Sequence, residues 1–316
     1  MHRMRGRRAG YPGRAAGLAV LAVLVAWPGL TAAAACCMSA ASFGVGRLKI
    51  WEDWAAGLQL GHARSIGQYQ ADGSLRRYGA DLADGLTRAE PWAIVRLHER
   101  VQVQAWLPVL LNDRRVGDQG QLAGGLGDAG AAVRTELVML GQYAGLPSLA
   151  FTVGGLAPTG RRPEDTALPL FAGTTGRGTW GLSVALESEY AFLPWFVRAD
   201  AGVTYLVPFT RSDTGARQRY APQLAVALSA GNEVLPERLV LALALSAEWE
   251  GPLQLAGAEV PASSARSISL AASAAFTVDP HWTLVASVSN GLWPGGAGVN
   301  RDARVGFTFG VRHGHF

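Results

Sequence analysis

Alternation of side-chain type is the feature of this sequence that most restricts its fold. Between Trp180 and Phe192, and again between Trp195 and Val207, alternate residues are mostly aliphatic or aromatic, with small or charged residues between them. Successive side chains of a β-strand point to opposite faces, so a period of two indicates strands rather than helices, whose period is about 3.6 residues. Each segment is therefore expected to be a strand with one apolar face.

The composition of the second face distinguishes two kinds of β-protein. The alternation recurs from Leu239 to Trp249 and from Ile268 to Val278, and the second face is mostly Gly, Ala, Ser and Gln. A soluble sandwich would carry Lys, Glu and Thr there. Small polar residues instead suit the lumen of a transmembrane barrel, whose apolar outer face ends in aromatic girdles. The aromatic residues at segment ends are Trp180, Tyr190, Phe192, Trp195, Trp249 and Trp282.

The lengths of the connections set the number of strands. Five short connections alternate with six long ones, which lie at residues 67–90, 108–128, 157–177, 208–217, 251–264 and 291–302. Transmembrane barrels pair short periplasmic turns with longer external loops. The sequence therefore predicts an all-β fold, a transmembrane antiparallel up-and-down β-barrel of about twelve strands. These are expected to begin near Trp54, Pro91, Val101, Gly130, Pro147, Gly178, Trp195, Arg219, Arg238, Ala265, His281 and Ala303.

The two ends of the barrel sequence bear on its closure. Gly57, Gly61 and Arg64 interrupt the first strand, so an additional hairpin within Gln68–Asp84 remains an alternative. The last strand should pair with the first, because a membrane offers no partner to an unpaired strand edge. The chain ends in Phe316, a terminal aromatic typical of outer-membrane barrels although out of phase with the strand before it. We expect the barrel-assembly machinery as a partner.

Residues 1–35 are expected to be a secretory signal peptide. An apolar stretch, Ala15–Leu30, follows a basic start and precedes the small residues 31–35. A membrane anchor is the alternative, but the stretch is shorter than the roughly 20 residues of a spanning helix. Lipidation of Cys36, next to Cys37, is an alternative to a disordered terminal pair. We expect residues 36–50 to be a periplasmic segment and 51–316 to form the barrel.

Charge excludes some partners. The leader holds five of the 28 basic residues, which leaves 23 against 24 acidic ones, so nothing in the mature chain suggests nucleic-acid binding. After the leader no stretch approaches 18 uninterrupted apolar residues, so helical spans are not expected. The expected partners are outer-membrane lipid and a small-molecule solute. The protein is expected to be a monomer in the bacterial outer membrane.

Most charges within the predicted strands share the inward parity, and we regard them as candidate lumen residues. A lumen of this kind is either closed by salt bridges or a wet, weakly selective pore. The alternative is that the charges are merely hydrated or paired with a neighbouring strand. The candidate lumen residues are Arg96, Arg134, Glu136, Glu187, Glu189, Arg198, Asp200, Arg219, Glu248, Glu250, Arg304 and Arg312.

Catalysis has little support in the sequence. Glu187 with Glu189, and Glu248 with Glu250, resemble acid–base pairs, but strand alternation produces such pairs routinely. The histidines are dispersed, so no metal site is expected. Only His62 maps near the external end, where barrel enzymes keep their catalytic groups. We therefore predict no enzymatic activity, no catalytic residues and no cofactor.

Three short motifs resemble a known family. Residues 124–128 (GGLGD), followed by a strand, resemble the GlGD element of outer-membrane proteins named for the meta pathway of phenol degradation. Residues 156–160 (LAPTG) and 176–180 (GRGTW) resemble that family's next two motifs, in matching order and spacing. The resemblance covers residues 92–205 well and the last third only by architecture. It implies an outer-membrane channel for small, often aromatic or apolar compounds, and it carries no catalytic residues.

The motif residues also have a structural interpretation. Gly125, Gly127 and Gly160 are expected to adopt backbone angles that side chains forbid, and Asp128 to accept backbone hydrogen bonds at a strand entrance. Pro158 and Thr159 complete the second motif. We favour this role over direct ligand contact.

The sequence therefore predicts an outer-membrane channel or transporter for small solutes, including hydrophobic or aromatic ones. The main alternative is a structural or sensing barrel without transport, and a barrel enzyme is a more distant one. Small inward residues such as Gly181, Ser183 and Gly202 leave room in the lumen and favour passage. The loop at 157–177 is the candidate constriction.

Overall fold

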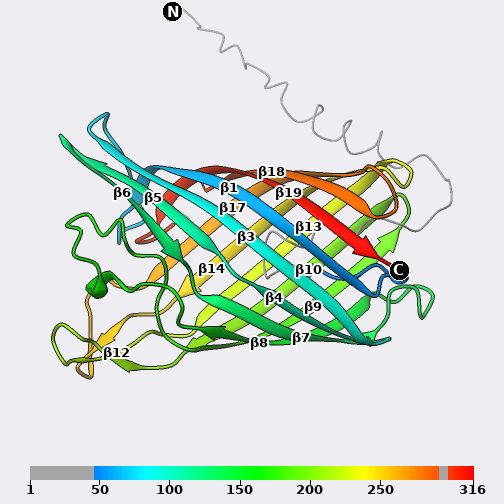
Figure 1. Cartoon of the computed structure of the whole chain (residues 1–316), viewed down its shortest axis with the longest axis horizontal. Coiled ribbons are helices and arrows are strands. Elements are labelled where there is room, and N and C mark those ends of the chain that lie inside the picture. Colours follow the sequence, from blue (N-terminus) through cyan, green and yellow to red (C-terminus); the bar gives the residue numbers. More distant parts are fainter. Residues whose placement is uncertain (1–45, 292–297) are drawn as a thin grey trace, which may run out of the picture. The chain divides into compact units, whose positions relative to one another are not determined.

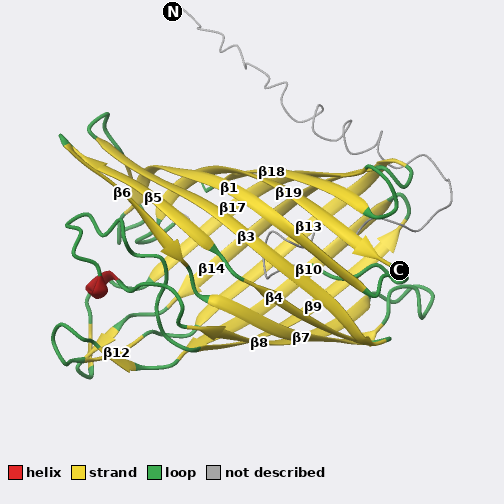
Figure 2. Cartoon of the chain, viewed as in Figure 1, coloured by secondary structure: helices red, strands yellow, loops and turns green. Residues whose placement is uncertain are grey.

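The computed structural model describes residues 46–291 and 298–316, which hold twelve antiparallel strands closed into one ring (Figure 1, Figure 2). The expected signal peptide and the two cysteines lie outside the described residues. No described helix is long and apolar enough to span a membrane. The ring strands are β1 (Trp54–Tyr69), β3 (Leu82–His98), β4 (Val101–Trp106), β7 (Ala129–Val138), β8 (Ser148–Ala157), β9 (Gly181–Phe192), β10 (Trp195–Leu206), β13 (Gln223–Leu235), β14 (Leu239–Glu250), β17 (Ala265–Thr277), β18 (Trp282–Asn290) and β19 (Asp302–His315).

Closure follows from the pairing of the first ring strand with the last. β1 pairs with β3 on one side and with β19 on the other, where Trp54 lies opposite His315 and Gln68 opposite Asp302. Each remaining ring strand pairs with its neighbours in chain order. The ring therefore satisfies the backbone N–H and C=O groups that hydrocarbon cannot hydrogen-bond.

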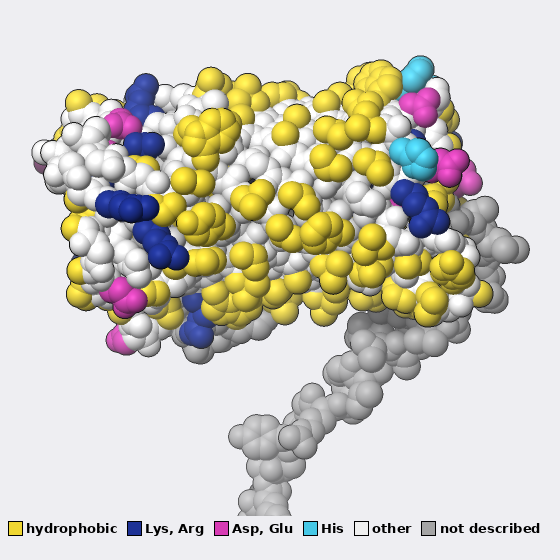
Figure 3. Space-filling view, turned by 90° about the horizontal axis from the view of Figure 1, so that it is seen from below, with side chains coloured by type: hydrophobic (Ala, Val, Ile, Leu, Met, Phe, Trp, Pro, Cys, Tyr) yellow, Lys and Arg dark blue, Asp and Glu magenta, His cyan; other side chains and the backbone are white. Residues whose placement is uncertain are grey.

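The outer surface of the ring is an apolar belt. Its aliphatic and aromatic side chains are exposed in the isolated barrel; Leu186 and Phe307, for example, are 47% and 58% exposed. Figure 3 shows hydrophobic side chains over the middle of the visible face and charged ones gathered at its two ends. An exposed apolar area of this extent suits lipid, because in water it would cause aggregation.

The expected twelve-strand barrel is confirmed, and ten of the twelve strands begin within three residues of the expected position. β1 runs without interruption through Gly57 and Gly61. At Gly57 a Cβ atom would lie 2.6 Å from the ring of Trp92, so glycine there makes room for an inward aromatic side chain. Short turns and long loops alternate as expected. We assign the end with the long loops as extracellular, because transmembrane barrels have short periplasmic turns.

One expected loop is a hairpin. The segment 108–128 forms β5 (Val109–Val116) and β6 (Gln119–Leu126), and β3 begins nine residues before Pro91 because its first half pairs with β5. Alternation in fact continues here, with Asn112 and Arg114 on one face and Leu111 on the other. Asp113 and Arg115 interrupt the apolar outward face of β5, so the sequence of this segment is typical of a loop. The hairpin extends the wall of the ring toward the extracellular side (Figure 1).

Two further expectations concern the loops. β13 begins at Gln223 rather than at Arg219, because Pro222 has no N–H to donate to the sheet. Arg219 instead ends β12 (Arg217–Arg219), which forms a small extracellular sheet with β11 (Phe209–Thr210), β15 (Gln254–Leu255) and β16 (Ala258–Glu259). The alternative hairpin within Gln68–Asp84 is present in short form, since β2 (Leu75–Arg77) pairs with the end of β1.

Candidate functional site

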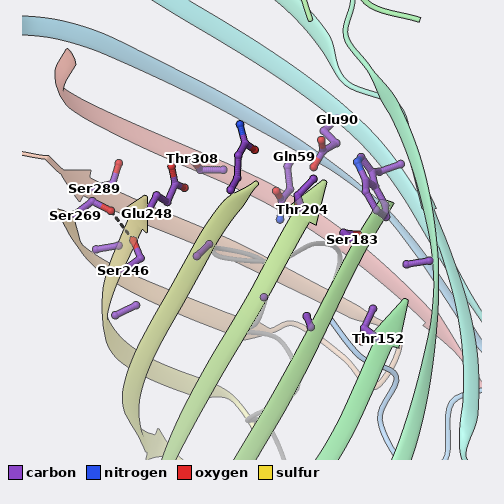
Figure 4. A pocket seen from close by; sticks show the side chains of 18 of the residues that line it. Gln59, Glu90, Thr152, Ser183, Thr204, Ser246, Glu248, Ser269, Ser289 and Thr308 are labelled. Carbon is purple, nitrogen blue, oxygen red and sulfur yellow. Dashed lines mark hydrogen bonds between the residues drawn. The ribbon is translucent and has the colours of Figure 1, made fainter. Parts of the chain in front are cut away.

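The lumen holds a cavity of about 610 Å³ bordered by strands around the ring. Its wall is built mainly from small and hydroxyl-bearing inward residues, and the hydroxyls of Ser246 and Ser269 lie 2.6 Å apart. Because these side chains are short, they line the space rather than fill it. Figure 4 shows the lining residues Gln59, Glu90, Thr152, Ser183, Thr204, Ser246, Glu248, Ser269, Ser289 and Thr308.

Toward the periplasmic end, inward charges of β7, β9 and β10 form a lumen ion-pair cluster. Glu187 lies at its centre and accepts hydrogen bonds from Arg134 Nε at 2.9 Å and from Arg198 at 3.2 Å. Thr152 donates a third at 2.8 Å. The members of the lumen ion-pair cluster are Arg47, Arg134, Glu136, Glu187, Glu189, Arg198 and Asp200.

The charges of the cluster offset one another closely. Arg134 also pairs with Glu136 at 2.7 Å, and Arg198 pairs with Asp200 at 2.8 Å. Glu189 pairs with Arg47 at 2.9 Å through one carboxylate oxygen, and its other oxygen is buried with no described hydrogen-bond partner. Burying a charge costs free energy unless the charge is paired. The ion pairs within and between these strands therefore offset the cost of burying their charged side chains.

Residues 47–52, which precede the first strand, form an N-terminal plug inside the periplasmic end of the lumen. Leu48 is 3% exposed and packs against the inward residues Ala55, Trp92 and Ile94. Its backbone N–H donates to Gln102 Oε1 at 3.1 Å. Of residues 36–50, which we expected to be periplasmic, residues 47–50 belong to this plug at the periplasmic end of the lumen.

Polar contacts hold the plug in place. Arg96 donates to the backbone carbonyls of Glu52 at 2.8 Å and Lys49 at 2.6 Å. Arg312 binds the Glu52 carboxylate with both guanidinium nitrogens, one at 2.6 Å, and Glu52 is fully buried. A second cavity of about 330 Å³ is lined by residues of the plug and of the periplasmic turns.

Other charges hold the extracellular rim. Glu250 accepts two hydrogen bonds from Arg177, at 2.6 and 2.8 Å, and one from Arg301 at 2.8 Å. Arg304 pairs with Asp302 at 2.8 Å and Asp84 at 3.3 Å. In the loop beside them, burial and the Asp302 carboxylate raise the pKa of Tyr78 to about 12, so its hydroxyl remains a donor to Asp302.

The three family-like motifs meet at Asp128, which lies between β6 and β7. Its carboxylate accepts backbone hydrogen bonds from Gly160 at 3.0 Å, Arg177 at 2.7 Å and Gly178 at 3.3 Å. Thr159 Oγ1 accepts from the Ala129 N–H at 2.9 Å and donates to the Gly127 carbonyl. Asp128 thereby joins the two ends of the loop between β8 and β9 to the wall, which is a structural role.

The reason for the motif glycines differs from the one we expected. Gly125, Gly127 and Gly160 do not have positive φ angles, so they are not needed for a left-handed backbone. Instead, a Cβ atom at Gly127 would lie 2.8 Å from the Pro108 ring, and one at Gly160 would lie 2.7 Å from the Gly176 Cα. Glycine is required there because segments approach closely. Pro158 directly follows the end of β8.

The expected lumen residues fall into distinct groups. Arg134, Glu136, Glu187, Glu189, Arg198 and Asp200 come together in the cluster, while Arg96 and Arg312 hold the plug. Glu250 and Arg304 belong to the rim, and Glu248 lines the main cavity. Arg219 is a correction, since it is exposed on the small extracellular sheet and does not line the barrel.

Sequence reasoning missed several functional candidates. Arg47, Lys49 and Glu52 lie before the first strand, where no alternation reveals an inward position. Their dense charge, in a chain whose only lysine is Lys49, was the available signal. The loop at 157–177, our candidate constriction, packs on the inward face of the hairpin, where Asn112 donates to the Ala172 carbonyl at 2.8 Å. None of residues 158–177 lines the main cavity.

The side chains that we considered for catalysis make ion pairs or lie on the outer face of the barrel. Glu187 and Glu189 are ion-paired in the cluster. His62 faces outward, where its Nδ1 lies 3.0 Å from the Thr87 hydroxyl and its ring near Phe307. Among the described residues no group of His, Cys, Asp or Glu is placed to hold a metal ion.

A closed ring with an apolar belt outside and a polar lumen inside defines an outer-membrane β-barrel. The chain has the fold of the outer membrane channel from Pseudomonas putida F1, with a TM-score of 0.69 at 16% identity, over 83% of this chain and 95% of that one. At this identity the likeness shows the fold alone. No protein-family model and no curated protein matches the sequence.

More distant likenesses extend over a similar part of the chain. The transport unit of the autotransporter AIDA-I from Escherichia coli has a TM-score of 0.48 at 8% identity, covering 85% of this chain and 93% of that one. The CymD monoaromatic hydrocarbon channel has a TM-score of 0.42 at 12% identity, covering 84% and 89%. These lower scores support no conclusion about this chain.

Proposed function

We propose that the protein is an outer-membrane channel for small solutes. The observation that carries this proposal is the cavity of about 610 Å³, whose wall is formed by short side chains such as Ser183, Gly202 and Ser269. A barrel that served only as a structural element would gain stability by filling this space with larger side chains. The same fold occurs in a protein described as an outer membrane channel.

The described conformation is a narrowed one. The N-terminal plug and the lumen ion-pair cluster occupy the periplasmic half, and Glu52 and Gln102 are at most 1% exposed there. Passage therefore requires the plug to move or solutes small enough to pass beside it. The plug is held by hydrogen bonds and ion pairs rather than by a large apolar interface, so its release is compatible with an intact ring.

The class of solute is proposed from the resemblance to the phenol meta-pathway family. That resemblance favours small aromatic or apolar compounds, and the motifs that carry it lie close together around Asp128. The second cavity also has aromatic residues in its wall, including Tyr143, Trp195 and Phe196. We propose no catalysis and no cofactor, and a monomeric barrel inserted by the assembly machinery.

The proposal is tested by solute flux into liposomes that contain the purified barrel. We expect entry of a small aromatic tracer above the rate of protein-free liposomes, and measurable ion conductance in a planar bilayer. Neither signal, from barrels that are folded by circular dichroism, would reject transport in favour of a structural or sensing barrel. Hydrolysis of lipid or peptide substrates by the same preparation would instead support the enzyme alternative.

A further inference from the structure

Exposed arginines at the extracellular end lack the partners that the inward arginines have. Arg114 and Arg115 are consecutive in β5, so they point to opposite faces. Inward Arg114 pairs with Asp84 at 3.1 Å. Outward Arg115 is exposed, and within the described residues its side chain makes no ion pair or hydrogen bond.

Arg64 of β1 is likewise an exposed, outward arginine. It lies opposite Val305, which is 38% exposed on the outer face, so Arg64 also points outward. It is exposed and has no side-chain partner in the described part of the chain. Two more exposed arginines, Arg76 and Arg77, follow on β2, which pairs with the end of β1.

The register brings Arg64 and Arg115 to the two sides of β3. Arg64 lies opposite Gly85, and Arg115 lies opposite Ala83. With about 4.8 Å between strands and 3.3 Å between residues, their Cα atoms are about 12 Å apart. The outward β3 residues between them, Ala83 and Gly85, are small and leave the space between the two arginine side chains open.

On the membrane side of Arg64 and Arg115 the next outward residues are His62 and Asp113, and Asp113 lies across Gly85 from Arg64. The apolar belt begins one position further, at Leu60 and Leu111, which are 46% and 43% exposed. Figure 3 shows on another face the same order, with basic side chains at the loop end and hydrophobic ones next to them. On the outward faces of β1, β3 and β5 the one acidic residue described is Asp113.

We propose that Arg64 and Arg115, assisted by Arg77, which lies opposite Gly67 on the same outward face, bind the phosphate groups of a phosphorylated lipid in the outer leaflet. Arginine forms bidentate hydrogen bonds with phosphate, and basic clusters beside a membrane span attract anionic headgroups. The acyl chains of this lipid lie on Leu60 and Leu111. The site anchors the barrel where the β5–β6 hairpin leaves the membrane.

The test measures binding of a bis-phosphorylated glycolipid of the lipid A type to the detergent-solubilised barrel by native mass spectrometry. Replacing both Arg64 and Arg115 with Gln is expected to weaken binding about 25-fold, at about fivefold for each arginine near a lipid surface. Arg238→Gln removes an exposed arginine at the periplasmic end and is expected to leave binding unchanged. Unchanged binding in the double variant overturns the proposal.

Two measurements on the unmodified protein keep the test independent of variant folding. The dephosphorylated lipid with the same acyl chains is expected to bind as weakly as the lipid binds to the double variant. Equal affinity for both lipids would show that the acyl chains alone bind, which overturns the proposal. Displacement of the lipid by inorganic phosphate at equal concentration would identify a site for free anions and also overturn it.

Discussion

At the scale of single residues, Glu187 shows what a charge in the lumen requires. It is bound by two arginines from neighbouring strands and by the hydroxyl of Thr152. Glu248 lines the open cavity and has no partner among the described residues. Both are inward glutamates in ring strands, so they form a matched pair that separates the effect of ion pairing from the effect of charge.

Replacing Glu187 with Ala should destabilise the barrel by about 3–5 kcal/mol, because it leaves Arg134 and Arg198 buried without their shared partner. Glu248→Ala should change the free energy of unfolding by less than about 1 kcal/mol. Guanidinium unfolding of the barrel in lipid vesicles, followed by tryptophan emission, measures both. Equal effects of the two substitutions would contradict the described pairing.

Asp128 is the second residue with a specific expectation. In Asp128→Asn an amide NH₂ can replace one of the oxygens that accept from the backbone of Gly160, Arg177 and Gly178, leaving buried donors without an acceptor. The loop between β8 and β9 should open more often, and trypsin should cut after Arg161 about tenfold faster, as expected for a loss of about 1.4 kcal/mol. Asp118→Asn, in the turn between β5 and β6, is the control. No difference in cleavage between the two variants would refute this role.

At the scale of elements, the N-terminal plug is a separate unit within the barrel. It is not a strand of the ring, and it is held by Arg96, Arg312 and a small apolar contact at Leu48. Such an element is able to leave without breaking strand pairing, because its backbone contributes little to the ladder. We therefore expect the plug to control the width of the periplasmic half.

Removing the plug contacts should increase ion conductance. Arg312→Ala removes the bidentate partner of the buried Glu52 carboxylate and leaves it only Lys49, whose Nζ is 3.9 Å away, as an ion-pair partner; this costs up to about 3–5 kcal/mol and favours release of the plug. Deleting residues 46–52 should raise single-channel conductance further, while Arg238→Ala, at the same end of the barrel, should leave it unchanged. If the deletion leaves conductance unchanged, the segment is not the constriction.

At the scale of the whole molecule, the belt fixes how the barrel sits in lipid. Outward Trp180, directly before β9, is 63% exposed, whereas inward Trp92 of β3 is 8% exposed. We expect the Trp180 ring to contact lipid and the Trp92 ring to face the lumen. This difference is the direct consequence of period-two alternation in a closed sheet.

Quenching by brominated lipids should distinguish the two tryptophans. In bilayers whose acyl chains carry bromine, Trp180→Phe should remove strongly quenched emission, because bromine contacts the Trp180 ring from outside. Trp92→Phe should remove emission that bromine does not quench. The measurement is the quenched fraction of total fluorescence in each variant. A larger loss of quenched emission from Trp92→Phe would mean that the faces of the ring are inverted.

The alternation of residues determined most of the fold by itself. Period two is a local property of each strand, so it located the twelve ring strands, their inward faces and ten of their starts. It also placed Glu187, Arg198 and Asp200 in the lumen, since each inward position follows from its neighbours in the same strand. The hairpin at 108–128 differs from the expected loop, because Asp113 and Arg115 interrupt the apolar face of its first strand.

Only the tertiary structure decided which of these residues meet. Glu187 contacts Arg134 and Arg198 because strand register aligns them across β7–β10, and register depends on pairing between distant segments rather than on either sequence alone. The plug and the contacts of Asp128 likewise join parts of the chain that have no shared period. The sequence specified which way each side chain points, whereas closure of the ring specified what it contacts.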